Sequence, residues 1–236
     1  MKTLTLRLTS PLQSYGNQAS FSRRTTATYP SKSAVIGLIS AALGYQRTDP
    51  RIQALNELAF AVRIDQPGRT LTDFQTVEWK KNTRKVTYRD YLQDAVFVVA
   101  FEGDDEQIEK ISDALRHPVY QLYLGRRANV PAGPLSLTIH RNSQPVDVLK
   151  KMEWQASTWY KKRQHEETIT VELIADAKLL PNQHEDLAKD RVISFDQRNR
   201  QLDYRPVVQE FILLKNDTFR ADSTFREGSH DAIEGV

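Results

Sequence analysis

The stretch AVFVVAF, residues 95–101, is the longest apolar run in the chain. A short run with β-branched and aromatic side chains on both faces is typical of a strand covered from above and below. It is far shorter than the ~20 residues that a membrane-spanning helix needs. The stretch therefore predicts the central strand of a buried sheet, and we expect no membrane span.

Segments with period-two alternation lie on both sides of this run. Leu4, Leu6 and Leu8 alternate with polar residues, which predicts a half-buried strand whose polar side chains face outward. The same alternation predicts strands at residues 59–65 and 135–140. Together with the apolar run they make four strands.

Two longer helices are predicted by cap residues followed by apolar residues at helical spacing. They run from Ser31 or Ser33 to Gly44 and from Asp104 or Asp105 to His117, with a shorter helix at residues 51–58. The order of the main elements is β-α-β-β-α-β, the ferredoxin-like pattern. The predicted fold class is therefore α+β.

The remaining segments predict the domain organisation. Residues 66–93 are polar and basic and read as an insert that enlarges the middle hairpin. Strands are predicted at residues 168–175 and 207–214, and apolar content falls after them. We expect a ferredoxin-like domain at 1–142 with the hairpin at about 66–93, a small β-rich C-terminal domain at 143–216, and a flexible tail at 217–236.

Composition narrows the function classes. The chain has 236 residues, no cysteine and a net charge of +3. Without cysteine there is no disulfide or thiolate chemistry, and with no signal peptide in view we expect a cytoplasmic protein. Residues 217–236 hold five acids and two bases, so the rest carries a net +6. A basic body favours an anionic partner, with nucleic acid ahead of a membrane.

One basic cluster precedes the first helix. Tyr15, Arg24 and Lys32 lie in a polar connection, and Lys32 stands between two serines at the helix start. A cation and a hydroxyl such as that of Ser33 beside a helix N-terminus can bind phosphate. The alternative is an ordinary helix cap with a solvated lysine, since such caps open most helices.

A second basic cluster is the hairpin insert. Cations that alternate with aromatic side chains can follow a phosphate backbone while the rings stack on unpaired bases. The alternative is a charged hairpin whose lysines prevent edge-to-edge aggregation. Trp79 precedes the first of these cations. The candidate residues are Lys80, Lys81, Arg84, Lys85, Tyr88 and Arg89.

A third cluster is the segment Tyr123-Leu124-Gly125-Arg126-Arg127 in the long loop at 118–134. Glycine allows a close backbone approach, and two adjacent arginines can bind phosphates in a forked geometry. The predicted outward positions of the first strand offer no aromatic platform of the kind an RRM uses. Loops and the hairpin, not the sheet, should therefore hold any RNA.

Catalytic signals are sparse. The five histidines are scattered, and we find no metal-ligand spacing, phosphate-binding loop or nucleophile elbow. His165, with Lys161 and Lys162 nearby, could support metal-independent RNA cleavage. The alternative is a solvated strand end, and we expect no cofactor and no bound metal.

Four segments, taken in order, resemble the CasD family, the subunit of type I-E Cascade that holds the 5′ handle of CRISPR RNA (crRNA). They are SPLQSYG at 10–16, YPSKSAVIGL at 29–38, RDYLQDA at 89–95 and LGRR at 124–127, with Arg24 between the first two. The resemblance covers roughly residues 3–140 and is specific as a set. Two departures from the family pattern occur, at Gln75 and at the pair Ala128-Asn129.

The resemblance implies a RAMP fold, in which a ferredoxin-like domain carries a protruding thumb hairpin and a smaller C-terminal domain follows. It implies a non-catalytic RNA-binding subunit that caps the backbone filament in antiviral defence. The implied partners are the crRNA 5′ handle, the Cascade backbone subunit and the large subunit, with target DNA contacted indirectly. A metal-independent endoribonuclease that processes CRISPR repeat RNA is the alternative.

The family's handle contacts transfer to matching positions only. They fall on Arg24, Lys32 and Ser33, on the hairpin at residues 84–89, and on the loop at residues 123–127.

Overall fold

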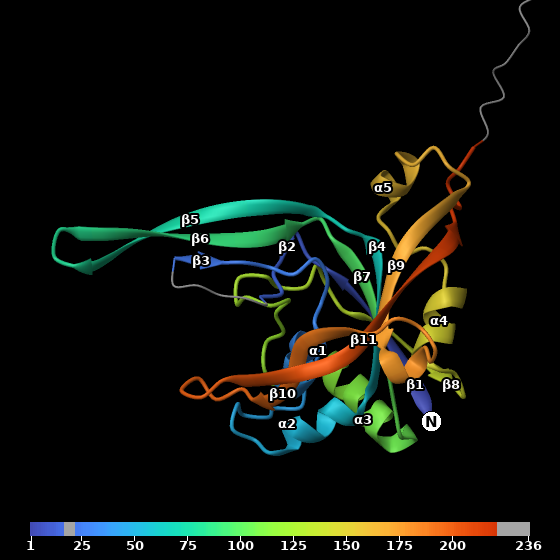
Figure 1. The fold of residues 1–236 in the computed structure, drawn as a ribbon, viewed down its shortest axis with the longest axis horizontal. Helices are drawn as coiled ribbons and strands as arrows, with labels where there is room; N and C mark the ends of the chain where they lie inside the picture. Colours follow the sequence, from blue (N-terminus) through green and yellow to red (C-terminus); the bar gives the residue numbers. More distant parts are fainter. Residues whose placement is uncertain (17–21, 221–236) are drawn as a thin grey trace, which may run out of the picture.

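The computed structural model describes residues 1–16 and 22–220 and shows a strand-rich mixed α/β fold with few helices (Figure 1). Seven strands form one antiparallel sheet in the order β10-β11-β9-β4-β7-β1-β8. The elements of the predicted β-α-β-β-α-β order are β1 (Lys2–Thr9), α1 (Lys32–Ala42), β4 (Ala59–Gln66), β7 (Val96–Gly103), α3 (Asp105–Arg116) and β8 (Ser136–Arg141).

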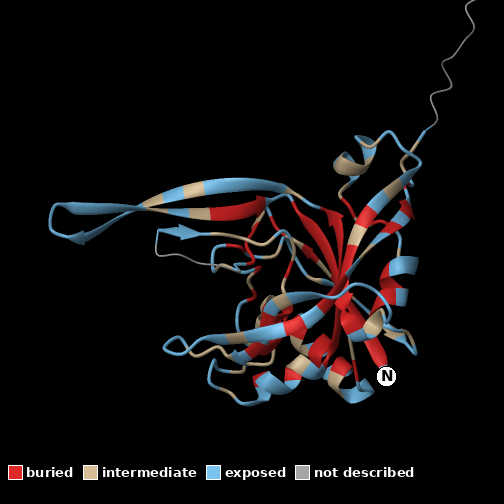
Figure 2. Ribbon diagram, viewed as in Figure 1, coloured by how far each residue is buried: buried red, intermediate tan, exposed pale blue. Residues whose placement is uncertain are grey.

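β7 is the predicted central strand, and this prediction is confirmed. It pairs with β1 on one side and with β4 on the other. Phe97 is fully buried in a cluster with α1 and α3, while Val98 is 1% exposed in a second cluster on the opposite face. Figure 2 shows this buried centre against the exposed hairpin and rims.

The prediction that β1 is half-buried was wrong, because the second face of the sheet is also covered. Thr3 is fully buried and Thr5 is 3% exposed. The cover is α4 (Pro145–Lys151) and the residues after it. Arg63 of β4 holds this segment by donating hydrogen bonds to the carbonyl oxygens of Met152 and Glu153, at 2.7 and 2.8 Å.

The predicted helix starts are confirmed. Ser31 caps α1 by accepting a hydrogen bond from the Ala34 backbone N–H, and Asp104 caps α3 through Gln107. The predicted short helix is α2 (Arg51–Ala54), followed by one 3₁₀ turn.

Residues 66–93 form the long hairpin of β5 (Arg69–Lys80) and β6 (Thr83–Gln93), which projects from the sheet (Figure 1). Two short strands brace its base, since β2 (Leu12–Gln13) pairs antiparallel and β3 (Arg23–Arg24) pairs parallel with β6. The hairpin base and the basic connection before α1 are therefore one structural unit.

The C-terminal strands β9 (Thr168–Asp176), β10 (Asp186–Ser194) and β11 (Gln201–Lys215) continue the same sheet, with β9 beside β4. The division into domains at residue 142 stays a prediction, and strands from both sides of it share one sheet. Of the predicted tail, residues 221–236 lie outside the described residues. β10, α4 and α5 (Thr158–Lys162) were not predicted.

A buried ionic cluster joins α1 to these C-terminal strands. The Lys32 ammonium donates to Asp176 at 3.1 Å, and the Lys32 backbone N–H donates to Asp190 at 2.7 Å. The Arg205 guanidinium binds Asp190 at 2.9 and 3.0 Å and also binds Asp176. Burial lowers the pKa of Lys32. The four charged groups balance one another, as buried ions must.

The loop at 123–129 packs against the segment before the hairpin base. The Ser14 backbone N–H donates to the Leu124 carbonyl at 3.2 Å, and Asn129 closes the loop on Leu124. Gly125 has φ +93°, and a Cβ there would lie 1.6 Å from the Ser14 carbonyl oxygen. The close approach allowed by this glycine is therefore to the chain itself.

Replacing Lys32 by methionine should lower the free energy of unfolding by about 3 kcal/mol, because it leaves a carboxylate uncompensated in the interior. Urea denaturation measures this change. The matched control is Lys81→Met at the exposed hairpin turn, which should stay within about 0.5 kcal/mol of the parent. Equal stabilities of the two variants would contradict a buried role for Lys32.

Gly125→Ala should cost more stability than Gly133→Ala, although both glycines have a positive φ, +93° and +95°. Nothing lies within 4 Å of a Cβ at Gly133, so that variant isolates the backbone cost of about 1–2 kcal/mol. The clash with Ser14 adds a further 1–3 kcal/mol or so. Thermal and urea unfolding of both variants measure the difference, and equal losses would contradict the tight contact.

Candidate nucleic-acid interface

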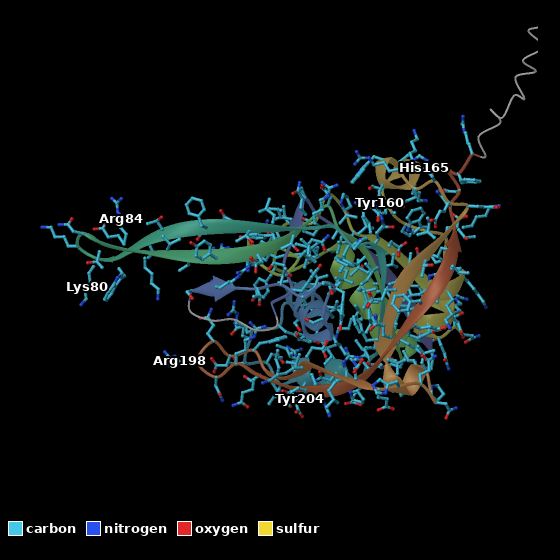
Figure 3. All side chains as sticks on the ribbon, turned by 45° about the horizontal axis from the view of Figure 1, so that its top comes forward. Lys80, Arg84, Tyr160, His165, Arg198 and Tyr204 are labelled. Carbon is cyan, nitrogen blue, oxygen red and sulfur yellow. The ribbon has the colours of Figure 1, made fainter. Side chains whose placement is uncertain are left out.

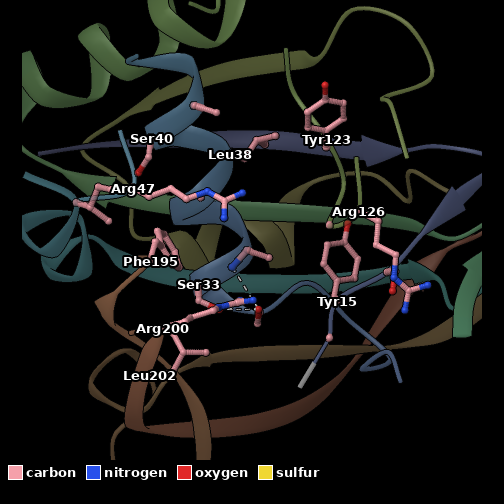
Figure 4. A pocket seen from close by; sticks show the side chains of 18 of the residues that line it. Tyr15, Ser33, Leu38, Ser40, Arg47, Tyr123, Arg126, Phe195, Arg200 and Leu202 are labelled. Atoms are coloured by element: carbon pink, nitrogen blue, oxygen red, sulfur yellow. Dashed lines mark hydrogen bonds between the residues drawn. The ribbon is translucent and has the colours of Figure 1, made fainter. Parts of the chain in front are cut away.

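A groove of about 1500 Å³ lies beside α1 (Figure 4). One wall is the loop around Tyr123 and Arg126 together with Tyr15 and Arg24, and the facing wall comes from the β10–β11 hairpin. The floor is the outer face of α1. Three segments far apart in the sequence thus line one open cavity.

The charged side chains that line the groove are almost all basic. Within the described parts of the chain, one carboxylate, Asp203, stands against five cations. Such a lining raises the local concentration of anions and favours a polyanionic strand. The five cations are Arg24, Arg47, Arg126, Lys189 and Arg200.

Arg126 is the best-positioned of these cations. Its guanidinium lies over the Tyr91 ring at 4.4 Å and donates through Nη2 to the Arg24 carbonyl oxygen at 2.8 Å. Its buried Nη1 has no hydrogen-bond partner among the described residues. A buried N–H group is costly when unpaired, so a ligand oxygen here would be stabilised.

The floor of the groove allows a close approach to α1. Ala34, Gly37 and Ala41 line it with small side chains, next to Phe195 and Leu202 from the β10–β11 hairpin. A Cβ on Gly37 would meet only the Phe195 ring, at 3.9 Å. The floor is therefore largely apolar, with the Ser33 and Ser40 hydroxyls of the same helix, beneath a basic rim, which suits a flat base joined to a phosphate backbone.

Tyr15 lines the groove without offering a free ring. It is 3% exposed, its hydroxyl donates to Gln13 at 2.6 Å, and its ring lies edge-on to Phe97 at 5.9 Å. Burial raises its pKa well above the usual range for tyrosine. Tyr15 therefore shapes the wall of the groove, and its ring cannot stack on a base.

The structure brings together only part of the predicted set. Ser33, Tyr123, Gly125 and Arg126 line the groove with Tyr15 and Arg24. Arg127 is exposed and is not part of the lining. The structure does not present Lys32 for the predicted phosphate contact, because its side chain is 4% exposed and paired with Asp176.

The predicted hairpin residues form a surface of their own. Figure 3 shows Lys80 and Arg84 at the far end of the hairpin, away from α1. Lys80 lies over the Trp79 ring at 4.7 Å. Lys81 and Lys85 are also exposed, as are Phe74, Trp79 and Tyr88, at 67, 59 and 46%. The cations and rings are thus exposed, and their predicted contact with RNA stays a prediction.

The base of the hairpin is the part that meets the groove. Arg24 of β3 pairs with Arg89 of β6, so the two basic clusters are adjacent there. Asp90 accepts hydrogen bonds from Thr72 at 2.8 Å and from Arg23 at 3.2 Å, and these two donors lower its pKa. The Asp90 carboxylate therefore fixes β3 against the hairpin.

Three of the five groove cations, Arg47, Lys189 and Arg200, were missed from the sequence. Arg47 follows α1 in a loop, and the other two belong to a hairpin that was not predicted. The sequence signal that could have found the two hairpin cations was the set of bases around Phe195, an apolar residue between polar ones.

The histidine considered for catalysis lies elsewhere. His165 is exposed beyond α5, and Figure 3 shows it far from the hairpin tip. Lys161 pairs with Asp217 at 3.0 Å. Within residues 1–16 and 22–220, no group of three histidine or acidic side chains could hold a metal ion. No described helix is long and apolar enough to cross a membrane.

Comparisons with known proteins indicate the same family as the sequence motifs do. The family model "CRISPR-associated protein (Cas_Cas5)" matches residues 3–208. The CRISPR system Cascade subunit CasD of Escherichia coli strain K12 is 34% identical over 171 residues, which cover 64% of this chain and 76% of that protein. These matches confirm the family resemblance read from the sequence.

Two solved structures are similar over nearly their full length. A chain of a CRISPR RNA-guided surveillance complex has a TM-score of 0.75 and 32% identity, covering 94% of this chain and 95% of its own. A Cas protein crystal structure has a TM-score of 0.64 and 27% identity, covering 92% and 97%. The chain belongs to the Cas5 family of CRISPR-associated proteins.

Proposed function

We propose that this chain is a non-catalytic subunit of a type I-E Cascade complex that binds the 5′ handle of crRNA in the groove beside α1. The observation that carries the proposal is the lining of five cations against one carboxylate in about 1500 Å³. The CasD relative is a Cascade subunit, and a similar chain comes from an RNA-guided surveillance complex. Both descriptions support the assignment.

The geometry of the groove suits single-stranded RNA. Arginine forks such as those of Arg24 and Arg126 bind phosphates, and the Nη1 of Arg126, unpaired in the described parts of the chain, can donate to one of their oxygens. The apolar floor around Gly37 and Phe195 can receive an unstacked base. A splayed single strand can place its bases and phosphates on different walls.

The strand order supports the proposal that the chain contains a ferredoxin-like domain with a thumb hairpin. The strand order β8-β1-β7-β4, with α1 and α3 on one face, is the order that a ferredoxin-like domain would have. The β5–β6 hairpin would then act as the thumb, with Arg84, Lys85 and Arg89 following the RNA away from the groove. In this proposal the chain caps the backbone filament, contacts the backbone and large subunits, and meets target DNA only through the complex.

Reversing one groove charge should weaken binding of handle RNA roughly tenfold, which is about 1.4 kcal/mol. We expect this loss for Arg126→Glu and Arg200→Glu. The slope of log affinity against log salt concentration should also become shallower by about one, which corresponds to one lost phosphate contact. Lys151→Glu on α4, across the sheet from the groove, is the control and should bind as the parent does. Fluorescence anisotropy at several salt concentrations measures both quantities.

Equal affinities of all these variants would contradict the groove assignment. The same RNA incubated with the parent chain in EDTA should stay at full length. Cleavage that is lost in His165→Ala would instead favour the ribonuclease alternative.

Filling the floor of the groove should block RNA without unfolding the chain. Gly37→Leu adds a side chain on the groove face of α1, and we expect at least a tenfold loss of affinity. Gly37→Ala is the matched control, since its Cβ makes only an ordinary contact with Phe195 at 3.9 Å. Both changes raise helix propensity, by up to about 1 kcal/mol. Unchanged RNA affinity of the leucine variant, with native circular dichroism, would show that RNA binds elsewhere.

A further inference from the structure

The outer half of β11 is an open sheet edge. β10 pairs with β11 only as far as Val207, while β9 covers residues 207–215 from the other side. No described strand or backbone group pairs with the free edge of residues 208–215. Figure 1 shows this part of β11 at the margin of the sheet. Its outward N–H and C=O groups are a template for one more strand.

Apart from the charged residues Glu210 and Lys215, this edge lacks the devices that normally protect one. β10 carries two register shifts, between Lys189 and Arg191 and between Val192 and Ser194, which disrupt pairing along it. The opposite edge of the sheet, β8, is short and presents polar side chains such as His140. Residues 208–215 pair with β9 without a register shift and contain no proline. An uncovered edge of this kind is a template for strand addition.

The side chains along the edge are unusually apolar for a surface. Phe211 is 65% exposed and Leu213 is 70% exposed, and as alternate residues they share one face of the strand. Ile212 and Leu214 point to the other face and are buried in the second core cluster. The exposed side chains of Phe211 and Leu213 contribute little to the stability of the fold. A partner that covered them would bury this apolar surface, which favours binding.

One carboxylate gives the edge a charge preference. Glu172 of β9 lies directly opposite Phe211, and Ile64 of β4 lies opposite Glu172 on its other side. The Glu172 carboxylate is half-buried and has no ion pair among the described residues. Burial raises its pKa. A cation that crosses Phe211 would pair with it and stack on the ring.

We propose that residues 208–215 of β11 dock an extended segment of another protein subunit of the Cascade assembly by strand addition. The segment would alternate apolar residues against Phe211 and Leu213 with a lysine or arginine that reaches Glu172. The proposal rests on the proposed function for the existence of the assembly. It adds the surface and the kind of partner, which lie outside the RNA groove.

Two other occupants fit the edge less well. The segment 221–236 follows close to the end of β11, but it is rich in acids and glycine and has no alternating apolar pattern. It would also place more carboxylates beside Glu172. A second copy that pairs Phe211 with Leu213 in an antiparallel register places its Leu213 across from Phe211 and its Lys215 across from Gln209, so it offers no cation opposite Glu172.

Hydrogen exchange in the assembled complex tests the proposal. The complex is reconstituted from this chain, the other Cascade subunits of the same CRISPR locus and the crRNA. Alternate amides of residues 208–215 should exchange at least tenfold more slowly in the complex than in the free chain. A photo-crosslinker at Phe211 should join a single extended segment of one subunit, whereas one at Leu187, which is 69% exposed on β10, should not.

Variants test the same surface by incorporation into the complex. Phe211→Lys with Leu213→Lys should lower incorporation at least tenfold, because lysines block strand addition and repel the partner's cation. Leu187→Lys, at equal exposure, should incorporate as the parent does. Glu172→Gln should lower incorporation severalfold. All of these variants should bind handle RNA as the free parent chain does.

The outcomes are distinct. Unchanged exchange at residues 208–215 in a complex that forms normally overturns the edge proposal and leaves the proposed function intact. Slow exchange already in the free chain also overturns it, with truncation after Arg220 and sedimentation at several concentrations identifying the tail or a second copy as the occupant. A parent chain that neither binds handle RNA nor enters the complex overturns the proposed function itself.

Discussion

The buried ionic cluster of Lys32, Asp176, Asp190 and Arg205 is the interaction on which the rest of the site depends. It fixes the start of α1 against β9, β10 and β11, which are separated from it by more than a hundred residues in sequence. Without that attachment the β10–β11 hairpin would have no defined position beside α1. The groove exists because one helix is held between two distant parts of the chain.

The same arrangement explains how a small protein presents so large a basic cavity. Its floor is a helix with small outward residues, and its walls are a glycine-dependent loop and a hairpin held by salt bridges. Each wall is rigid for a different reason, which preorganises the cations for a flexible anion. Preorganisation lowers the entropy cost of binding.

Local patterns predicted much of the fold and part of the site. The apolar run at residues 95–101 identified β7, and Ser31 and Asp104 were predicted as helix caps, because strand burial and capping depend on neighbours in sequence. The burial of Thr3 was not predictable, since its cover comes from α4 through long-range contacts. Lys32 resembled a phosphate ligand because its acidic partners lie on strands far along the chain. Arg200 was missed because the β10–β11 hairpin lies beside α1 only through long-range contacts.

The β5–β6 hairpin has a mechanical consequence. Its strands of 12 and 11 residues extend roughly 36 Å at about 3.3 Å per residue. β2 and β3 brace only residues near its root, up to Tyr88. The outer part of the hairpin therefore extends beyond these bracing strands, so its exposed cations lie far from the root that is fixed beside the groove.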